Sequence, residues 1–489
     1  MNRPQDGVLY PLYQPFRQSQ GSYPTPATQR DIAWFERARI GMFVHWNHCT
    51  VAPGEISWVM KDGTLSLAEY QAMAQTKPIW EVQAHGLTMA AYEGMAELFN
   101  PVEFSAERWV AMARDAGFNY LLMVVKHHDG FAMWDTRTSK YKITNTPFKR
   151  DVCREIADAC HRAGMRLGWY YSPADWWHPA SREGDWDTYV AYMQEQLREL
   201  MTGYGTIDFL AFDYWSPACD HPSWPDFYRE LRRLCPHYLH NRSTPWAIGD
   251  YECMEHVVPY VRQRDSTADS GIAVDEYRSG MTCAAPFEVM TCLQGGRWSY
   301  EFGKAISLKS LISLLIDAAA CGGNLTLNVT PDALGRIPSA QIERLREFAA
   351  WMRIHGETLV GTNSGPFPPV LVNRTADADP RSMAPAMFGG GALRNKDSRC
   401  VIGCTSSGSR MYLHVLEWSG ATILVLPGVA DRVVSCRILG KGPVVMLRAG
   451  TDLRLTIPEA DHDLPDTVIV VELDGPADQI TDLRAPRFG

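Results

Sequence analysis

The 489-residue chain lacks most of the short patterns that mark common classes of enzyme. It contains no CxxC or HExxH spacing for zinc, no GxSxG of serine hydrolases, and no P-loop or strand-linked GxGxxG for nucleotides. Neither a run of eighteen apolar residues nor an internal repeat occurs. These absences argue against zinc peptidases, serine hydrolases, nucleotide-binding enzymes and proteins that cross a membrane by helices.

An excess of basic residues is also missing. The chain has 47 Lys and Arg against 56 Asp and Glu, and its net charge is −9. Because recognition of a phosphate backbone needs clustered basic residues, we expect no nucleic-acid partner, and we expect no membrane partner. The first residues, "MNRPQDGVLYPLYQP", lack the apolar core of a signal peptide, so we expect a cytoplasmic protein, or a periplasmic or secreted one if a leader was trimmed. A homo-oligomer remains compatible with the sequence.

Tryptophan, in contrast, is abundant. The chain has 16, many of them beside His or Asp, as in "HWNHC", "ADWWHP" and "DYWSP". Indole faces stack on the apolar side of a pyranose ring, whereas the sugar hydroxyls need fixed polar partners. We expect roughly two-thirds of these tryptophans to be ordinary core residues and the rest to favour a sugar site. The twelve cysteines are scattered and are expected to be reduced core residues.

The chain is too long for one ordinary core, and its pattern changes once. From residue 104 onward, amphipathic helical segments alternate with apolar strands, which indicates parallel βα units. The expected helices are 105–117, 149–164 and 186–204, and the expected strands are 41–46, 120–125, 165–172, 207–215, 238–243, 288–293 and 324–329. We predict an α/β fold with a (β/α)8-like barrel, in which 120–125 is the third strand.

Short strands separated by turn residues follow residue 355. Such regular spacing is typical of a β-sandwich. The expected strands are 410–418, 421–427, 432–439, 444–449, 453–458 and 467–473. We therefore predict an N-terminal segment at 1–29, a (β/α)8-like catalytic domain at 30–355 and a C-terminal antiparallel β-sandwich at 366–489.

Polar residues recur just after the expected barrel strands. His127 and His128 follow one strand, Asp175 follows the next, and Asp213 ends a third. Active sites of βα barrels lie where the carboxyl ends of the strands converge, so these residues are candidates for one site. Because neighbouring residues of an extended strand point to opposite sides, we do not expect His127 and His128 to share a metal ion, and we expect neither a metal nor a cofactor.

Two carboxyl groups are needed for general acid–base and nucleophilic cleavage of a glycoside. Asp213, at the end of "IDFLAFD", is a candidate for the first, although an aspartate at this place also serves as a helix cap or ion-pair partner. Asp250, Glu252 and Glu255 of "GDYECMEH" are candidates for the second. The residues alone leave the choice among them open.

Several segments together resemble glycoside hydrolase family 29, the α-L-fucosidases. They lie within residues 30–350 and include "GMFVHW", "KHHDGF", "WYYSPADWWHP", "DFLAFD" and "GGNLTLNVTPDALGRIP". The resemblance implies a (β/α)8-like domain followed by a β-sandwich, and a retaining mechanism without a metal. It places the nucleophile on Asp213, although the family's "WFDG" is "AFDY" here. The general acid/base falls on Glu255, with Glu252 as the alternative.

The same resemblance implies a set of sugar-binding residues. They are His45, Glu55, Trp58, His127, His128, Trp134, Tyr171, Arg242 and Trp298. The family's "EW" pair is split here between Glu55 and Trp58, and "HWNHC" replaces the family's "HWGxx". We therefore expect an exo-acting retaining α-L-fucosidase whose partner is a carbohydrate with a terminal α-L-fucoside. A retaining glycosidase for another α-L-hexoside and a carbohydrate-binding protein that has lost catalysis are the alternatives.

Overall fold

The computed structural model describes most of the chain beyond residue 26. The residues outside this description are 1–26, 53, 215, 242–248, 257, 259–260, 264–275, 279–285, 301–303, 372–399 and 482. Arg242, which the sequence predicts to bind sugar, therefore lies outside the described residues.

Eight parallel strands form one sheet in the order β5-β4-β3-β2-β1-β10-β9-β6. Their bounds are β1 (Ile40–Val44), β2 (Tyr120–Lys126), β3 (Arg166–Tyr171), β4 (Phe209–Phe212), β5 (Leu239–His240), β6 (Glu252–Glu255), β9 (Phe287–Cys292) and β10 (Asn324–Val329). The two edge strands, β5 and β6, meet through a parallel bridge between Asn241 and Tyr251, which closes the sheet. The predicted βα barrel is confirmed.

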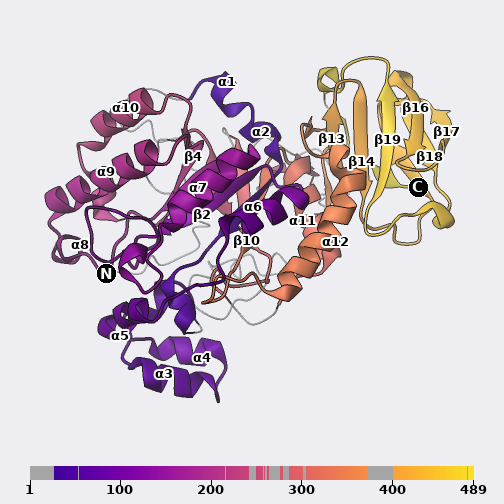
Figure 1. Cartoon of the computed structure of the whole chain (residues 1–489). Coiled ribbons are helices and arrows are strands. Elements are labelled where there is room, and N and C mark those ends of the chain that lie inside the picture. Colours follow the sequence, from indigo (N-terminus) through magenta and orange to yellow (C-terminus); the bar gives the residue numbers. More distant parts are fainter. Residues whose placement is uncertain are drawn as a thin grey trace, which may run out of the picture.

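Helices connect most successive strands along the outside of the barrel (Figure 1). The longer ones are α6 (Ala106–Asp115), α7 (Val152–Ala163), α9 (Trp186–Gly203), α10 (Trp224–Leu234), α11 (Leu308–Ala320) and α12 (Ser339–His355). The shorter ones are α1 (Gln29–Ile32), α2 (Phe35–Ala38), α3 (Leu67–Ala74), α4 (Ile79–His85), α5 (Met89–Gly94) and α8 (Pro179–Glu183). Within the described residues no helix follows β5 or β6.

One expectation about the strands needs correction, and one strand was not predicted. The strand at 120–126 is the second of the barrel, not the third, because the long connection after β1 contains only helices and loops. The sixth barrel strand along the chain, β6, was not predicted, because it has no apolar run and Glu252 and Glu255 are among its four residues. The candidate acid/base residues therefore stand on a barrel strand.

Side chains alternate between the inside and the outside of the barrel. On β2, Leu122 and Val124 belong to the interior cluster, whereas Leu121, Met123 and Val125 pack under the surrounding helices. This alternation is the period of two that every strand has. It decides which residue of each strand end faces the mouth of the barrel.

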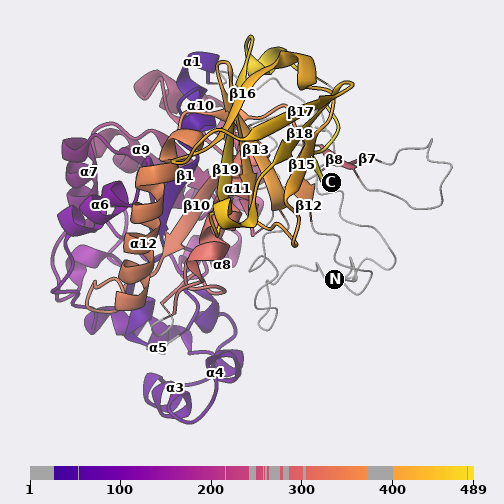
Figure 2. The same ribbon diagram turned by 90° about the vertical axis from the view of Figure 1, so that its right-hand side faces the viewer.

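Two antiparallel sheets follow the barrel (Figure 2). One contains β11 (Asn363–Ser364), β12 (Val370–Leu371), β13 (Cys400–Ser407), β14 (Arg410–Val415), β19 (Thr467–Leu473) and β16 (Val433–Ile438). The other contains β17 (Val445–Ala449), β18 (Asp452–Thr456), β15 (Ile423–Leu426) and β20 (Arg487–Phe488). Apolar side chains from both sheets form one core, so the predicted sandwich is confirmed. A separate hairpin pairs β7 (Val261–Gln263) with β8 (Glu276–Arg278).

The sandwich packs on the barrel through α11 and β13. At this contact a Cβ atom on Gly403 would come within 2.7 Å of Ile316 Cγ2 and 3.3 Å of Ala320 Cβ. Glycine is therefore needed for the close approach of the strand to the helix.

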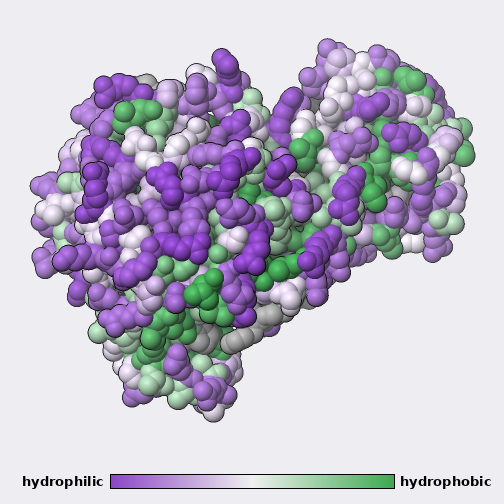
Figure 3. All heavy atoms as spheres, in the orientation of Figure 1, coloured by the Kyte–Doolittle hydropathy of each residue, from purple (hydrophilic) through white to green (hydrophobic). Residues whose placement is uncertain are grey.

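Among the helices of the described residues, none combines the length and the hydropathy that a membrane span requires. Hydrophilic residues cover most of the barrel face visible in Figure 3.

Candidate active site

Asp213 lies directly after β4, at the mouth of the barrel. Its carboxylate accepts hydrogen bonds from the Tyr170 hydroxyl and from the Tyr214 backbone N–H, the latter at 2.8 Å. Burial, followed by the nearby charge of Glu255, raises the pKa of Asp213 to about 6, and the Tyr170 hydrogen bond opposes this rise. A held carboxylate of this kind is suited to nucleophilic attack.

Glu255 ends β6 and faces the same mouth. On this strand Cys253 points into the barrel, where its thiol lies 3.1 Å from Glu288, whereas Met254 packs in the outer core. Alternation therefore directs Glu255 inward and Glu252 outward. Trp298 Nε1 donates a 2.8 Å hydrogen bond to the Glu255 carboxylate. Although Glu255 is an exposed residue at the rim, the protein packed around its carboxyl group raises its pKa.

His127 and His128 face the site together, which corrects the expectation that they point apart. Their ring centroids are 4.0 Å apart, because the chain leaves the extended conformation directly after Lys126. In addition, the register between β2 and β3 shifts between Val124 and Lys126. Such a bulge reverses the phase of a strand, so Lys126 packs outside the barrel while the histidines enter its mouth. The candidate ligand atoms of His127, His128 and Asp213 lie within 4.8 Å of one another, a geometry that would admit a metal ion.

The histidines of the site are neutral. Burial lowers the pKa of His45 and of His128 to about 3, and it lowers the pKa of His127 well below the ordinary value. They therefore act as hydrogen-bonding groups, not as cations, at neutral pH.

His45 follows β1 and is fixed by Asn328 of β10. Its Nδ1 lies 2.9 Å from Asn328 Oδ1, and its ring packs against Trp298 with centroids 4.9 Å apart. The Glu55 carboxylate accepts backbone N–H groups of Trp298 and Ser299, at 3.1 and 2.9 Å. Burial raises the pKa of Glu55 to about 7. Glu55 thus holds the Trp298 loop in place.

Aromatic residues form a rim beside the histidines. Trp58 lies edge-on to His128 and to Trp176, with ring centroids 5.9 and 5.1 Å away. Tyr214 is 4.9 Å from His128, and the Lys61 ammonium lies 5.0 Å from the Trp58 ring. Aromatic walls around polar groups are suited to binding a sugar ring.

The comparisons with known proteins agree with this geometry. The family model described as alpha-L-fucosidase matches residues 13–357. The chain belongs to the α-L-fucosidase family. It is therefore a glycoside hydrolase, and the resemblance inferred from its motifs is confirmed.

Individual relatives are distant but similar over most of their length. The plasma alpha-L-fucosidase of Rattus norvegicus is 25% identical over 374 residues, which are 72% of this chain and 74% of the relative. Alpha-L-fucosidase isoenzyme 1 from Paenibacillus thiaminolyticus is 27% identical and superposes with a TM-score of 0.68 over 93% of this chain and 100% of its own. A Bacteroides thetaiotaomicron enzyme, solved as a trapped covalent intermediate, shares the fold with a TM-score of 0.70 at 19% identity, over 92% of this chain and 97% of its own.

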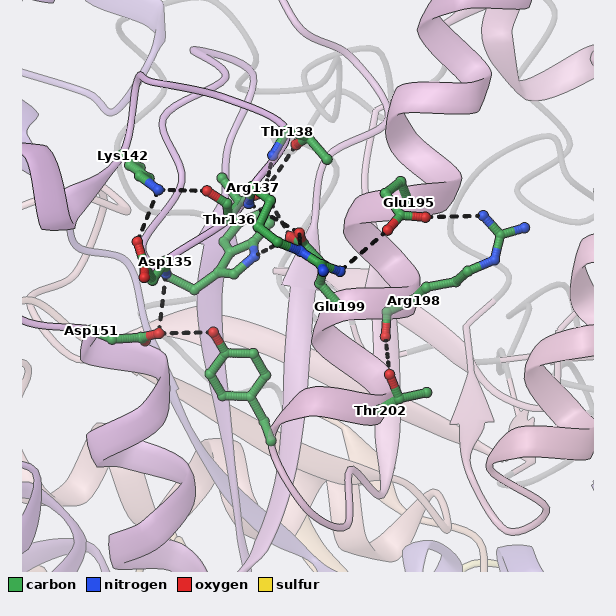
Figure 4. A network of polar contacts seen from close by, with 12 residues as sticks. Asp135, Thr136, Arg137, Thr138, Lys142, Asp151, Glu195, Arg198, Glu199 and Thr202 are labelled. Atoms are coloured by element: carbon green, nitrogen blue, oxygen red, sulfur yellow. Dashed lines mark hydrogen bonds and ion pairs between the residues drawn. The ribbon is translucent and has the colours of Figure 1, made fainter.

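Two predicted sugar-binding residues of this fucosidase-family protein lie away from the cluster. Trp134 is buried, and its Nε1 donates a 3.0 Å hydrogen bond to Glu199 of α9. Figure 4 shows Glu199 among the polar residues of the loop 135–138. Tyr171 is also buried on the outer side of β3, where its hydroxyl donates to Gln196 at 2.7 Å. The structure brings together eight of the described candidates, which are His45, Glu55, Trp58, His127, His128, Asp213, Glu255 and Trp298. Of the remaining acidic candidates, Asp175 pairs with Lys126, Asp250 pairs with Arg232, and Glu252 faces outward.

Several other residues of the site were not predicted from the sequence. Tyr170, the inward neighbour of Tyr171, donates to Asp213, and Asn328 fixes His45. Ser57 and Ser172 contact the Nδ1 atoms of His127 and His128 respectively. The alternation of β3 could have indicated Tyr170, and a buried Asn near the end of β10 could have indicated Asn328. No signal in the sequence pairs the serines with the histidines.

Proposed function

We propose that this family member is an exo-acting, retaining α-L-fucosidase that removes terminal α-L-fucosyl residues from oligosaccharides or glycoconjugates. The observation that carries the proposal is the pair Asp213 and Glu255. They come from the ends of two barrel strands and face the same mouth. Burial raises the pKa of both carboxyl groups, and the charge of Glu255 raises the pKa of Asp213 further. One member of such a pair ionises while the other keeps its proton.

The proposed reaction has two steps. Asp213 attacks the anomeric carbon and forms a glycosyl ester, while Glu255 gives its proton to the departing glycosidic oxygen. Glu255 then takes a proton from water, whose oxygen attacks the same carbon and releases Asp213. The two carboxyl groups supply the nucleophile and the proton, so no metal ion enters the mechanism.

Cleavage at the end of a glycan chain is supported by the side chains that fill the barrel interior. Below the histidines, Tyr120 lies 3.0 Å from Glu288 and 2.6 Å from Thr326, and all three side chains are buried. A glycan cannot pass through this packed interior. A sugar ring that enters from the mouth therefore stops above this layer, which is consistent with binding of a terminal residue.

One observation favours a second candidate, a retaining glycosidase for another α-L-hexoside. Both oxygens of the Glu55 carboxylate are occupied by the backbone of Trp298 and Ser299. If both bonds persist when substrate binds, each oxygen has one lone pair left, and this restricts the sugar hydroxyls from which Glu55 can accept.

The test compares aryl glycosides on the purified full chain. We expect release of nitrophenol from nitrophenyl α-L-fucoside to exceed release from other nitrophenyl α-L-hexosides, and Asp213→Ala to abolish it. A higher kcat/KM on a different hexoside would favour the second candidate. Binding of L-fucose without turnover of any aryl glycoside would instead indicate a carbohydrate-binding protein.

A further inference from the structure

The adjacent histidines His127 and His128 are held by two different serines. Ser57 Oγ lies 2.6 Å from Nδ1 of His127, and Ser172 Oγ lies 2.6 Å from Nδ1 of His128. All four side chains are almost fully buried. A neutral imidazole carries one proton, on either Nδ1 or Nε2. Each serine hydroxyl makes one further hydrogen bond, and that bond decides whether the serine donates to Nδ1 or accepts from it.

Ser57 acts as the donor to His127. Its hydroxyl oxygen already accepts the backbone N–H of Asp129 at 2.9 Å. Among the residues that the structure describes, His127 Nδ1 is the one remaining acceptor within reach of the hydroxyl proton. Leaving that proton unpaired in a buried residue is unfavourable, so it goes to Nδ1. The imidazole proton of His127 is then on Nε2.

Ser172 has the opposite relation to His128. Its hydroxyl donates to the carbonyl oxygen of Ala174 at 2.9 Å, and this buried carbonyl has no other donor in the described part of the chain. With its proton used, Ser172 Oγ accepts from Nδ1 of His128. Nε2 of His128 therefore keeps a free lone pair.

The two Nε2 atoms are the ring nitrogens left for a ligand. The ring centroids of His127 and His128 lie only 4.0 Å apart, so one oxygen can reach both rings at hydrogen-bond distance. A hydroxyl group is the chemical group that accepts one hydrogen bond and donates another.

We propose that Ser57 and Ser172 fix opposite tautomers of His127 and His128, so that the pair reads one sugar hydroxyl as both acceptor and donor. The identity of the sugar rests on the proposed function, whereas the tautomers do not. Ser57 and Ser172 are thus positioning residues for specificity. An ether, a fluorine or a hydrogen at the same place loses at least one of the two bonds.

The first test is neutron diffraction of the deuterium-exchanged, unliganded protein. We expect deuterium on Nε2 of His127 and on Nδ1 of His128. Deuterium on Nδ1 of His127 or on Nε2 of His128 would overturn the proposal, whatever the substrate. The result is independent of turnover, so failure of the proposed function is a separate outcome.

The second test measures calorimetric binding of L-fucose and its monodeoxy and monodeoxyfluoro derivatives. Fluorine still accepts weakly but cannot donate. At one hydroxyl position we expect Ser172→Ala to lower the affinity for L-fucose about tenfold and to leave the affinity for the fluoro sugar unchanged. Ser57→Ala should lower the affinity for both sugars. Ser172→Thr, which keeps the hydroxyl, should restore affinity. Equal effects of both alanine variants on every derivative would contradict the tautomer assignment.

Discussion

At the scale of single residues, Asp213 and Glu255 cannot both keep their ordinary acidity. Both are surrounded by protein, and the charge of Glu255 adds to the rise in the pKa of Asp213. Ionisation of Glu255 therefore opposes ionisation of Asp213. The geometry also separates roles, since Tyr170 stabilises the ionised form of Asp213, whereas Glu255 lies at the open rim.

The outward direction of Glu252 makes it a matched control for Glu255. We expect Glu255→Ala to lower kcat on nitrophenyl α-L-fucoside about 10²–10⁴-fold, because general acid–base catalysis contributes that much. Azide should partly restore turnover and yield a fucosyl azide, since it attacks the glycosyl ester without needing a base. Glu252→Ala should retain near-normal kcat. If azide instead rescued the Glu252 variant, Glu252 would be the general acid/base.

Tyr170 and its outward neighbour Tyr171 give a second matched pair. The Tyr170 hydroxyl lowers the pKa of Asp213 from the value that burial alone would impose. Asp213 must be ionised to attack, so kcat/KM should fall as the pH drops below about 6. In Tyr170→Phe the pKa of Asp213 rises, and the acid limb of the kcat/KM profile should move to higher pH. Tyr171→Phe should leave that limb in place.

At the scale of secondary-structure elements, the end of β2 and the loop after β3 are locked together. Lys126 Nζ lies 3.2 Å from the Asp175 carboxylate, and both side chains are 0% exposed. The ammonium also lies 4.5 Å from the Tyr171 ring centroid. This contact fixes the histidines that follow β2 relative to Trp176, which follows Asp175 in the chain.

Loss of one partner of this buried pair should be more damaging than loss of both. Lys126→Met leaves a buried, unpaired Asp175, and we expect the free energy of unfolding to fall by about 3–5 kcal/mol. In Lys126→Met/Asp175→Asn no uncompensated charge remains, and most of the stability should return. Thermal unfolding of the three proteins provides the measurement. A double variant that is less stable than the single one would contradict this account.

At the scale of the whole molecule, the sandwich is joined to the barrel through a helix of the barrel. Gly403 of β13 permits the approach to Ile316 and Ala320 of α11. A closed barrel has no free sheet edge, so the contact uses a helix surface. The active-site mouth receives its described residues from the barrel part of the chain.

A single methyl group should disturb this junction. We expect Gly403→Ala to destabilise the protein by about 1–3 kcal/mol, because an added Cβ overlaps Ile316. Gly442→Ala is the control, since no atom lies within 4 Å of an added Cβ there. The melting temperature should fall in the first variant and stay within error in the second. Equal melting temperatures would show that the junction tolerates the extra volume.

The sequence predicted the barrel, the sandwich and the clustering of polar residues at strand ends, because hydrophobic periodicity and chain length are local properties. It could not separate Glu252 from Glu255, since β6 is short and polar and its phase is set by pairing with β9. For the same reason, Tyr171 was predicted from the sequence as a site residue, although Tyr170 is the one that faces the site.

The prediction that His127 and His128 point apart was wrong for a physical reason. By itself, the sequence determined that two histidines follow a buried strand. Only the tertiary structure decided where they point, because the register shift before Lys126 depends on the neighbouring strand β3. Their proton positions depend on Ser57, which lies 70 residues away in the sequence, and on Ser172, which lies 44 away. Hydrogen bonds over such separations exist only once the barrel has closed.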